Sequence, residues 1–251
     1  ASELKEFANS KNVKLDVIEL DVVSDESVNR AVAQMPAIDV LINNAGSGFL
    51  GTLEAFSSSQ CLAQLDLNIV GPFRVAKAVL PGMRAQKDGL IIQVSSIAGR
   101  GAFPGNGVYH ASKWGLEGMS EALRYEVAPL GIDVVLVEPG PFGTNFLANM
   151  IEPTDKNVAA AYSHVTEFFD GLAEQFKAMY ADESLPTNPM VVVEIFESLI
   201  NSPAGSRPLR TIAGLDFGFQ SLNDVVEPIR KASLESMGLL AWDGPRSREE
   251  M

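Results

Sequence analysis

Tyr109 and Lys113 stand four residues apart in the segment YHASK, so both side chains would project from one face of a predicted helix. A tyrosine that donates or takes a proton near neutral pH needs its pKa of about 10 lowered. A neighbouring ammonium group lowers that pKa because it stabilises the phenolate. Such a pair also occurs by chance on solvated helices, so by itself it indicates acid–base chemistry only weakly.

Ser96 lies just after the apolar run Leu90–Val94 and thirteen residues before Tyr109. If that run is a strand of an open parallel sheet, Ser96 lies outside its carboxyl end, where such sheets bind ligands. Its hydroxyl can donate to a carbonyl oxygen or accept from an alcohol. The alternative is a turn serine, since glycines follow at 99 and 101. Together with Tyr109 and Lys113, Ser96 favours a site that handles an alcohol or a carbonyl group.

Two further segments follow apolar runs in the same way. Residues 43–46 (NNAG) follow the run 38–42, and their small side chains let a ligand approach the backbone closely. Residues 139–144 (PGPFGT) follow the run 132–137 and turn the chain sharply. Each segment alone could be ordinary turn chemistry. Together with Ser96 they predict a shared crevice at the carboxyl ends of neighbouring parallel strands.

The elements that position these residues alternate between two kinds. Short apolar runs predict strands at 13–20, 38–42, 90–94, 132–137 and 209–213, and helical spacing predicts helices over 25–34 (capped by Ser24), 58–80, 109–129, 190–200 and most of 145–180. Runs that are apolar at nearly every position are typical of parallel sheets covered by helices on both faces. The sequence therefore predicts one α/β domain with a doubly wound, Rossmann-type parallel sheet. Its parts would be a core at 13–144, a helical lid at 145–190 and a loose tail at 242–251.

Composition excludes several classes of function. The 251 residues are 46% hydrophobic and 20% charged, which is typical of a globular protein. The net charge of −13 disfavours nucleic-acid partners and anionic membranes. No apolar run approaches the ~20 residues of a membrane span, no signal peptide is recognisable, and Cys61 is the only cysteine, so we expect a cytoplasmic protein. No cluster of His, Cys and carboxylates has the spacing of metal ligands, so we expect no metal.

As a set, NNAG, Ser96, YHASK and Pro139-Gly140 resemble the short-chain dehydrogenase/reductase family in order and spacing, over roughly residues 13–144. The resemblance implies an oxidoreductase that interconverts an alcohol and its ketone or aldehyde by hydride transfer with NAD or NADP. It implies that Tyr109 is the general acid/base and that Ser96 orients the substrate oxygen. Lys113 would bind the nicotinamide ribose and lower the pKa of Tyr109. Asn68 would be the fourth catalytic residue.

The same resemblance implies a set of cofactor-binding residues, in which Asp21 and Val22 contact the adenine. The full set is Asp21, Val22, Asn44, Ala45, Gly46, Tyr109, Lys113, Pro139, Gly140, Phe142 and Thr144. The residue that distinguishes NAD from NADP belongs to the second strand of such sheets, which this sequence does not contain. The choice between the two cofactors therefore stays open.

The family's Gly-rich phosphate-binding turn has no counterpart here, because residues 1–43 contain no glycine. The opening residues resemble the family's second helix and third strand, so we expect the first two strands of its sheet to be missing. One interpretation is that the sequence begins within a longer enzyme. The alternative is a shortened protein that pairs 13–20 with 38–42 and serves as a non-catalytic binding or assembly protein.

The stretch after Thr144 is rich in bulky apolar side chains, and the corresponding region of the family covers the substrate. This content favours a hydrophobic alcohol or carbonyl compound, such as a steroid, a retinoid or a medium-chain lipid, and resembles the hydroxysteroid and retinol dehydrogenase-like branch. We predict substrate contacts by Phe142, Phe146 and Met150 in addition to Ser96. An amphipathic helix packed on the core would account for about half of these apolar residues.

Other side chains of the predicted helices carry further expectations. Pro72 has no N–H, so the helix 58–80 should open there and free the Asn68 carbonyl to hold a water. His110 follows Tyr109 on the helix and should lie on the surface. Trp114 and Leu116 suit a contact between subunits, which predicts a homodimer or homotetramer.

Overall fold

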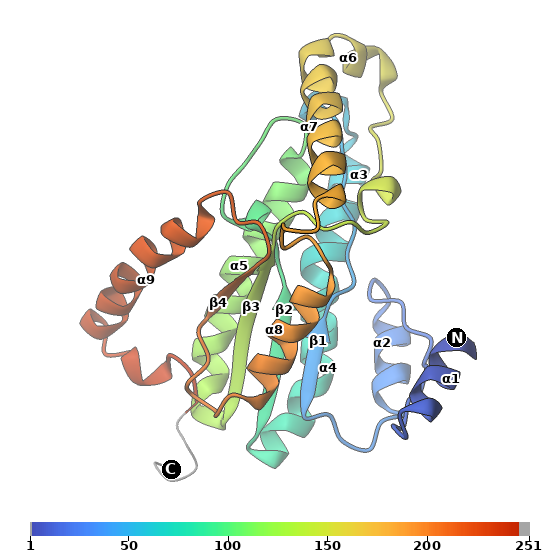
Figure 1. Ribbon diagram of the computed structural model, residues 1–251. Helices are drawn as coiled ribbons and strands as arrows, with labels where there is room; N and C mark the ends of the chain where they lie inside the picture. The colour runs from blue at the N-terminus through green and yellow to red at the C-terminus, as the bar shows by residue number, and fades with distance from the viewer. Residues whose placement is uncertain (1, 246–251) are drawn as a thin grey trace.

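A single parallel sheet forms the centre of the computed structural model, which describes residues 2–245. Within this range the strands lie in the order β1-β2-β3-β4. Their bounds are Val40–Asn43 (β1), Gly89–Val94 (β2), Ile132–Pro139 (β3) and Arg210–Ala213 (β4). Figure 1 shows helices over both faces of this sheet. The α/β class and the doubly wound parallel sheet are therefore confirmed.

Most of the helices lie close to the predicted positions. They are α1 (Ser2–Ser10), α2 (Asp25–Val32), α3 (Ser58–Leu65), α4 (Gly71–Gln86), α5 (Gly107–Val127), α6 (Lys156–Ala160), α7 (Ser163–Ala181), α8 (Met190–Asn201) and α9 (Phe219–Ser236). Ser24 caps α2 as predicted, because its side chain accepts a hydrogen bond from the Ser27 N–H. Between residues 2 and 245, no helix has the length and apolar content that a membrane crossing requires.

Two layers of helices bury the sheet. On one face, α4 and α5 contribute Val79, Met83 and Val127 to a cluster with Ile91 and Val134 of the sheet. On the other face, α8 packs Leu199 and its neighbours against the opposite side chains of β2 and β3. Both faces of these central strands are thus buried, which explains why the sequence is continuously apolar there.

The prediction of a strand at 13–20 is wrong. Val13, Leu15 and Val17 lie in a segment without strand pairing and are 58%, 41% and 50% exposed. An extended run becomes a strand only where a neighbour satisfies its backbone hydrogen bonds, and β1 is an edge strand that pairs with β2. The pairing of 13–20 with 38–42, which the alternative of a shortened binding protein needs, does not form.

The helix predicted over 58–80 opens where Pro72 was expected to break it. A wider, π-helical turn at Asp66–Val70 separates α3 from α4, and the Gly71 N–H bonds back to the Asp66 carbonyl. Such turns form where a normal helical hydrogen bond is lost. The opening turns the Asn68 side chain into the protein, where it is almost fully buried.

Helix α9 was missed by the sequence reasoning, which predicted no element between 213 and 242. Its apolar side chains Leu222, Val225 and Ile229 face solvent, while Asn223 and Arg230 are buried. Helix prediction from periodicity looks for an apolar stripe towards the core. In α9 the buried face is largely polar, so that signal was absent.

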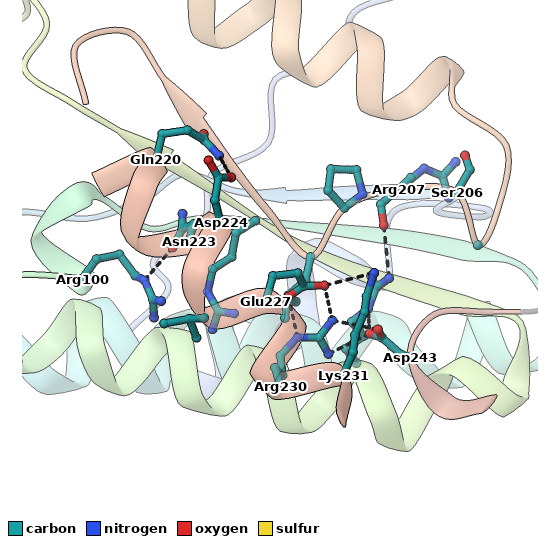
Figure 2. Close-up of a pocket in the computed structure, with 16 residues that line it drawn as sticks. Arg100, Ser206, Arg207, Gln220, Asn223, Asp224, Glu227, Arg230, Lys231 and Asp243 are labelled. Atoms are coloured by element: carbon teal, nitrogen blue, oxygen red, sulfur yellow. Dashed lines mark hydrogen bonds and ion pairs between the residues drawn. The ribbon is translucent and has the colours of Figure 1, made fainter. Parts of the chain in front are cut away.

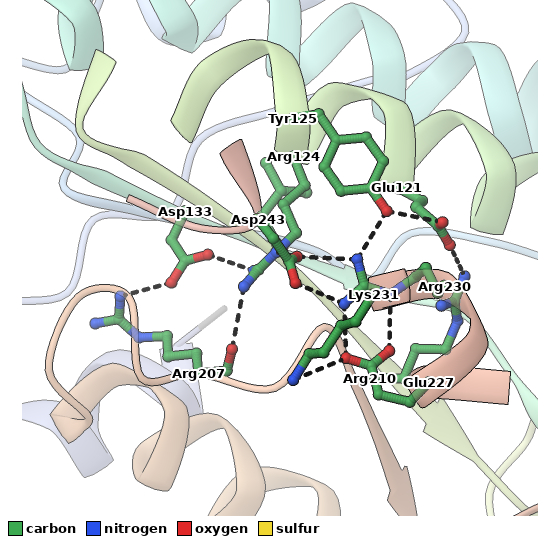
Figure 3. A network of polar contacts seen from close by, with 11 residues as sticks. Glu121, Arg124, Tyr125, Asp133, Arg207, Arg210, Glu227, Arg230, Lys231 and Asp243 are labelled. Atoms are coloured by element: carbon green, nitrogen blue, oxygen red, sulfur yellow. Dashed lines mark hydrogen bonds and ion pairs between the residues drawn. The ribbon is translucent and has the colours of Figure 1, made fainter. Parts of the chain in front are cut away.

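A network of charges holds α9 and the chain that follows it against α5 and β3 (Figure 3). Buried Arg124 donates to Asp133 at 2.5 Å and pairs with Asp243 at 3.0 Å. Arg207 also reaches Asp133, at 3.2 Å, and Arg230 bonds to Asp243 at 2.7 Å. Asp243 belongs to the tail predicted to be loose, so the structure differs from that prediction for 242–245. Residues 246–251 of the tail lie outside the described residues.

Candidate functional site

Three parallel strands bring the candidate residues together at their carboxyl ends. β1, β2 and β3 run in parallel, with Asn43 beside Gln93 and Val94 beside Val137. The segments that follow these strands therefore emerge on the same side. The first turns of α5 lie against the segment after β2. The carboxyl ends of the strands are thus a meeting point of four chain segments.

Ser96, Tyr109 and Lys113 lie together at these strand ends. Tyr109 and Lys113 project from the start of α5, and both are buried. A hydrogen bond joins the Ser96 and Tyr109 side chains, and the Ser96 hydroxyl also donates to the Pro139 carbonyl at 3.3 Å. The Lys113 Nζ lies 5.9 Å from the centre of the Tyr109 ring and donates to the Val94 carbonyl at 2.9 Å. The sequence spacing thus produces a phenol, a hydroxyl and an ammonium group side by side.

The pKa of Tyr109 is shifted in the direction opposite to the predicted one. Burial raises it to about 12, and the hydrogen bond with Ser96 lowers it only in part. Burial also lowers the pKa of Lys113 to about 8, against the opposing charge of Glu117. Because the Lys113 ammonium bonds to a backbone carbonyl, the loss of solvent around the phenol dominates.

Asn68 links the loop after β1 to α5. Its Nδ2 donates to the Ser47 carbonyl at 2.9 Å and to the Ser112 hydroxyl at 3.0 Å, and its Oδ1 accepts from the Ser47 N–H. A Cβ at Gly46 would lie 3.1 Å from the Asn68 Oδ1 and 3.8 Å from the Lys113 Nζ. The glycine therefore allows a close approach, and Asn68 holds the loop beside Lys113.

The predicted cofactor residues differ in their surroundings. Residues 44–46 are exposed next to the Lys113 Nζ, so their backbone is open to a ligand. Val22 instead packs against Gly71, and the Asp21 carboxylate accepts from the Val23 N–H. Before β1, the described chain has no Gly-rich turn that could hold a pyrophosphate, since it contains no glycine there.

Phe146 and Met150 pack beside the candidate site, and Phe142 packs on the sheet. The Phe146 ring lies 5.7 Å from the Tyr109 ring, centre to centre. A Cβ at Gly48 would lie within 3.1 Å of both Phe146 and Met150, so these side chains pack over the loop after β1. Phe142 packs against the core cluster under α8. The apolar wall next to Tyr109 is thus formed by the segment that precedes α6.

Two expectations about α5 are wrong. His110 is only 3% exposed, because the loop after Ser96 folds over the start of the helix and covers it. Leu116 is buried within the chain and cannot contact another subunit. Trp114 is 52% exposed and remains available for such a contact.

A polar cavity of about 410 Å³ lies between α9 and the segment leading into β4 (Figure 2). Arg210 and Arg230 line it, but Arg210 pairs with Glu117 at 2.8 Å and Arg230 with Asp243 at 2.7 Å. Its lining contains none of the predicted catalytic residues. Small-molecule sites are mostly apolar with a few placed polar groups, so the strand ends are the better candidate.

The buried carboxyl of Glu138, at the end of β3, borders this network. Asn223 donates to it at 2.5 Å, and the Arg100 and Arg210 Nε atoms lie 3.7 and 3.6 Å away. Burial, reinforced by the charge of Glu117, raises the pKa of Glu138 to about 7. At pH values between its ordinary pKa and this one, the folded chain holds a proton that the unfolded chain has lost.

The stability of the protein should therefore depend on pH through Glu138. The contribution of Glu138 to the free energy of unfolding should fall as the pH rises from about 4.5 to about 7, because the unfolded carboxyl releases its proton first. In Glu138→Gln this decrease should be smaller. Urea unfolding at a series of pH values measures it, with Glu174→Gln on the exposed side of α7 as the control. A Glu138→Gln profile parallel to that of the parent chain would contradict the assignment.

Comparison with known proteins gives a consistent picture. A family model described as short chain dehydrogenase matches residues 1–155. The 3-ketodihydrosphingosine reductase of Bacteroides thetaiotaomicron is 37% identical over 185 residues, which cover 72% of this chain and 66% of that protein. Retinol dehydrogenase 8 of Homo sapiens is 42% identical over 138 residues, which cover 55% of this chain and 44% of that protein. The matches thus span less than two thirds of either relative.

A solved structure shows the same arrangement of elements. A short-chain dehydrogenase from Streptomyces avermitilis superposes with a TM-score of 0.70 at 27% identity. The superposition covers 94% of this chain and 85% of that chain. The similarity therefore extends beyond residue 155 into the C-terminal helices.

Proposed function

The chain belongs to the short-chain dehydrogenase family, and on that premise we propose that it is an NAD(P)-dependent oxidoreductase acting on a hydrophobic alcohol and its ketone or aldehyde. The observation that carries this proposal is the close grouping of Ser96, Tyr109 and Lys113 at the carboxyl ends of the strands. A phenol, a hydroxyl and an ammonium group in one buried place are suited to moving a proton to or from a carbonyl oxygen.

Each of these side chains has a distinct part in the reductive direction. Tyr109 donates its proton to the carbonyl oxygen, which the Ser96 hydroxyl holds in place. Burial raises the pKa of Tyr109 to about 12, which keeps the phenol protonated but makes it a weaker acid, so the phenolate formed on proton transfer needs a neighbouring positive charge. Lys113 stabilises the phenolate that remains. The nicotinamide, when bound, supplies the hydride.

Asn68 contributes to the site indirectly. Its amide holds the loop at Ser47 and so keeps residues 44–46 open beside Lys113. These three residues would line the adenine ribose and Lys113 would bind the nicotinamide ribose, with Pro139, Gly140 and Thr144 on the side of β3. Either NAD or NADP is compatible with this set.

A hydrophobic substrate is favoured by the apolar wall beside Tyr109. Phe146 and Met150 form this wall and would exclude water from the reacting carbonyl. The names of two relatives, retinol dehydrogenase and 3-ketodihydrosphingosine reductase, describe a lipid alcohol and a lipid ketone as their substrates. We therefore extend the proposal to retinoid, steroid or long-chain lipid carbonyls.

One observation favours a second function, a binding or assembly protein without catalysis. Residues 1–43 have no glycine and so no Gly-rich turn for a pyrophosphate. The pairing of 13–20 with 38–42, which this alternative required, does not form. A measurement of activity distinguishes the binding protein from the oxidoreductase.

The test is turnover by the purified chain, followed by the absorbance of the reduced nicotinamide. NADH and NADPH are each supplied with a retinoid aldehyde, a steroid ketone and a long-chain 3-keto lipid, and acetone serves as the small hydrophilic control. We expect oxidation of one reduced nicotinamide with a lipid carbonyl and little with acetone. A chain that is folded by circular dichroism and binds NADH or NADPH in a titration, but turns over none of these pairs, would favour the non-catalytic protein.

A further inference from the structure

His110, the residue after Tyr109, holds the loop that carries Ser96 through hydrogen bonds. This loop leaves β2, makes a short turn at Ile97–Gly99 and passes over the start of α5. His110 contacts it at two points. The His110 Nδ1 lies 2.9 Å from the Ala98 carbonyl oxygen, and the Phe103 N–H donates to the His110 Nε2 at 2.9 Å.

These two contacts select one form of the imidazole ring. The Nε2 accepts a hydrogen bond from the Phe103 backbone N–H and therefore carries no proton itself. The Nδ1 then bears the hydrogen and donates it to the Ala98 carbonyl. Burial lowers the pKa of His110, which agrees with a neutral ring. The Phe103 ring packs edge-on at 5.5 Å and leaves His110 little freedom to rotate.

A chain of hydrogen bonds leads from this ring to the candidate site. His110 bonds to the Ala98 carbonyl, and the N–H of the same residue donates to the Ser96 Oγ at 3.1 Å. The Ser96 hydroxyl donates in turn to the Pro139 carbonyl. The Ala98 residue is therefore fixed on one side by His110 and holds Ser96 on the other.

We propose that His110 is a positioning residue, whose Nδ1–H tautomer fixes Ala98 and thereby holds the Ser96 hydroxyl against Tyr109. The first part of α5 then carries both Tyr109 and His110, and His110 sets the distance between the Tyr109 phenol and the Ser96 hydroxyl. The effect on turnover rests on the function proposed above, whereas the hydrogen bonds of the loop can be tested without it.

The first measurement is the tautomer itself. The chain has two histidines, so His164→Asn leaves His110 as the only imidazole in a long-range ¹H–¹⁵N spectrum. His164 is exposed on α7, and its replacement should leave the fold unchanged. We expect a protonated Nδ1 and an unprotonated Nε2 at neutral pH. A protonated Nε2 would overturn the proposal.

The second measurement separates the two hydrogen bonds. In His110→Asn the amide N–H can replace the Nδ1 donor, and in His110→Gln the side-chain oxygen can replace the Nε2 acceptor. His110→Leu replaces neither. Hydrogen exchange of the Ala98 amide reports the bond to Ser96. Protection of this amide should persist in His110→Asn and fall in His110→Gln and His110→Leu, while a folded His110→Leu with full protection would refute the proposal.

Turnover gives the third measurement. A displaced hydroxyl should lower kcat by about 10²-fold in His110→Gln, with a smaller change in KM, and His110→Asn should recover most of the loss. A role in stability alone predicts equal kcat values for the folded fraction of both variants. If the parent chain shows the expected exchange pattern but no turnover, the proposed function fails and the positioning of Ser96 stands. If His110→Leu does not fold, the proposal is tested by comparing Ala98 amide protection and kcat between His110→Asn and His110→Gln.

Discussion

Replacing Tyr109 by phenylalanine should lower kcat by about 10²- to 10⁴-fold, the usual contribution of a general acid. The change removes one hydroxyl and leaves the ring in contact with Phe146, so the apolar wall stays intact. Ser96 loses its partner but keeps its bond to the Pro139 carbonyl. Binding of the nicotinamide should change little, because the ring volume is retained. Steady-state kinetics with the best lipid carbonyl, together with a binding titration, measures both effects.

Tyr125 offers a matched control for this variant. It lies on the same helix and is partly buried, but its hydroxyl bonds to Glu121 and Arg230, away from the strand ends. Tyr125→Phe removes the same atom and should leave kcat unchanged. Activity in Tyr109→Phe within a factor of about ten of the parent would show that another group transfers the proton.

The second large effect concerns stability and should follow from Arg124→Met. Arg124 is buried, with bonds to the Asp133 carboxylate, the Val134 carbonyl and Asp243 (Figure 3). Methionine fills much of the volume but leaves these acceptors without their donor. Breaking a buried ion pair from one side costs about 3–5 kcal/mol, and we expect the lower end because Arg207 still reaches Asp133.

Urea unfolding measures this loss of stability. Equal values of m, the dependence of the unfolding free energy on urea concentration, in the parent and the variant would indicate that both unfold in the same two-state manner. Lys156→Met is the control, since its partner Glu152 is exposed and such surface pairs contribute less than about 1 kcal/mol. A cost below about 1 kcal/mol for Arg124→Met alone would mean that the network does not hold α9 in place.

Predictions that depend on local physics agree with the structure. The runs 90–94 and 132–137 became the buried strands β2 and β3, because a strand covered on both faces needs apolar residues at successive positions. Ser24 caps its helix through its own side chain. Pro72 opens the long helix because the missing N–H is a property of the residue itself.

Predictions that depend on a distant partner failed. Residues 13–20 have the composition of a strand but no neighbouring strand to pair with. Helix α9 buries Asn223 and Arg230, whose partners Glu138 and Asp243 come from elsewhere in the chain. His110 is covered by a loop whose path the helix does not determine. Neither periodicity nor residue type records such partners.

For the candidate site, the sequence by itself determined which groups meet. A spacing of four on one helix pairs Tyr109 with Lys113, and the parallel course of the strands brings Ser96 to the same edge. Only the tertiary structure decided how these groups behave. The pKa of Tyr109 rises because the folded chain removes water from the phenol and directs the Lys113 ammonium to a backbone carbonyl. Proximity follows from the order of residues, whereas solvation and hydrogen-bond direction depend on everything that packs around them.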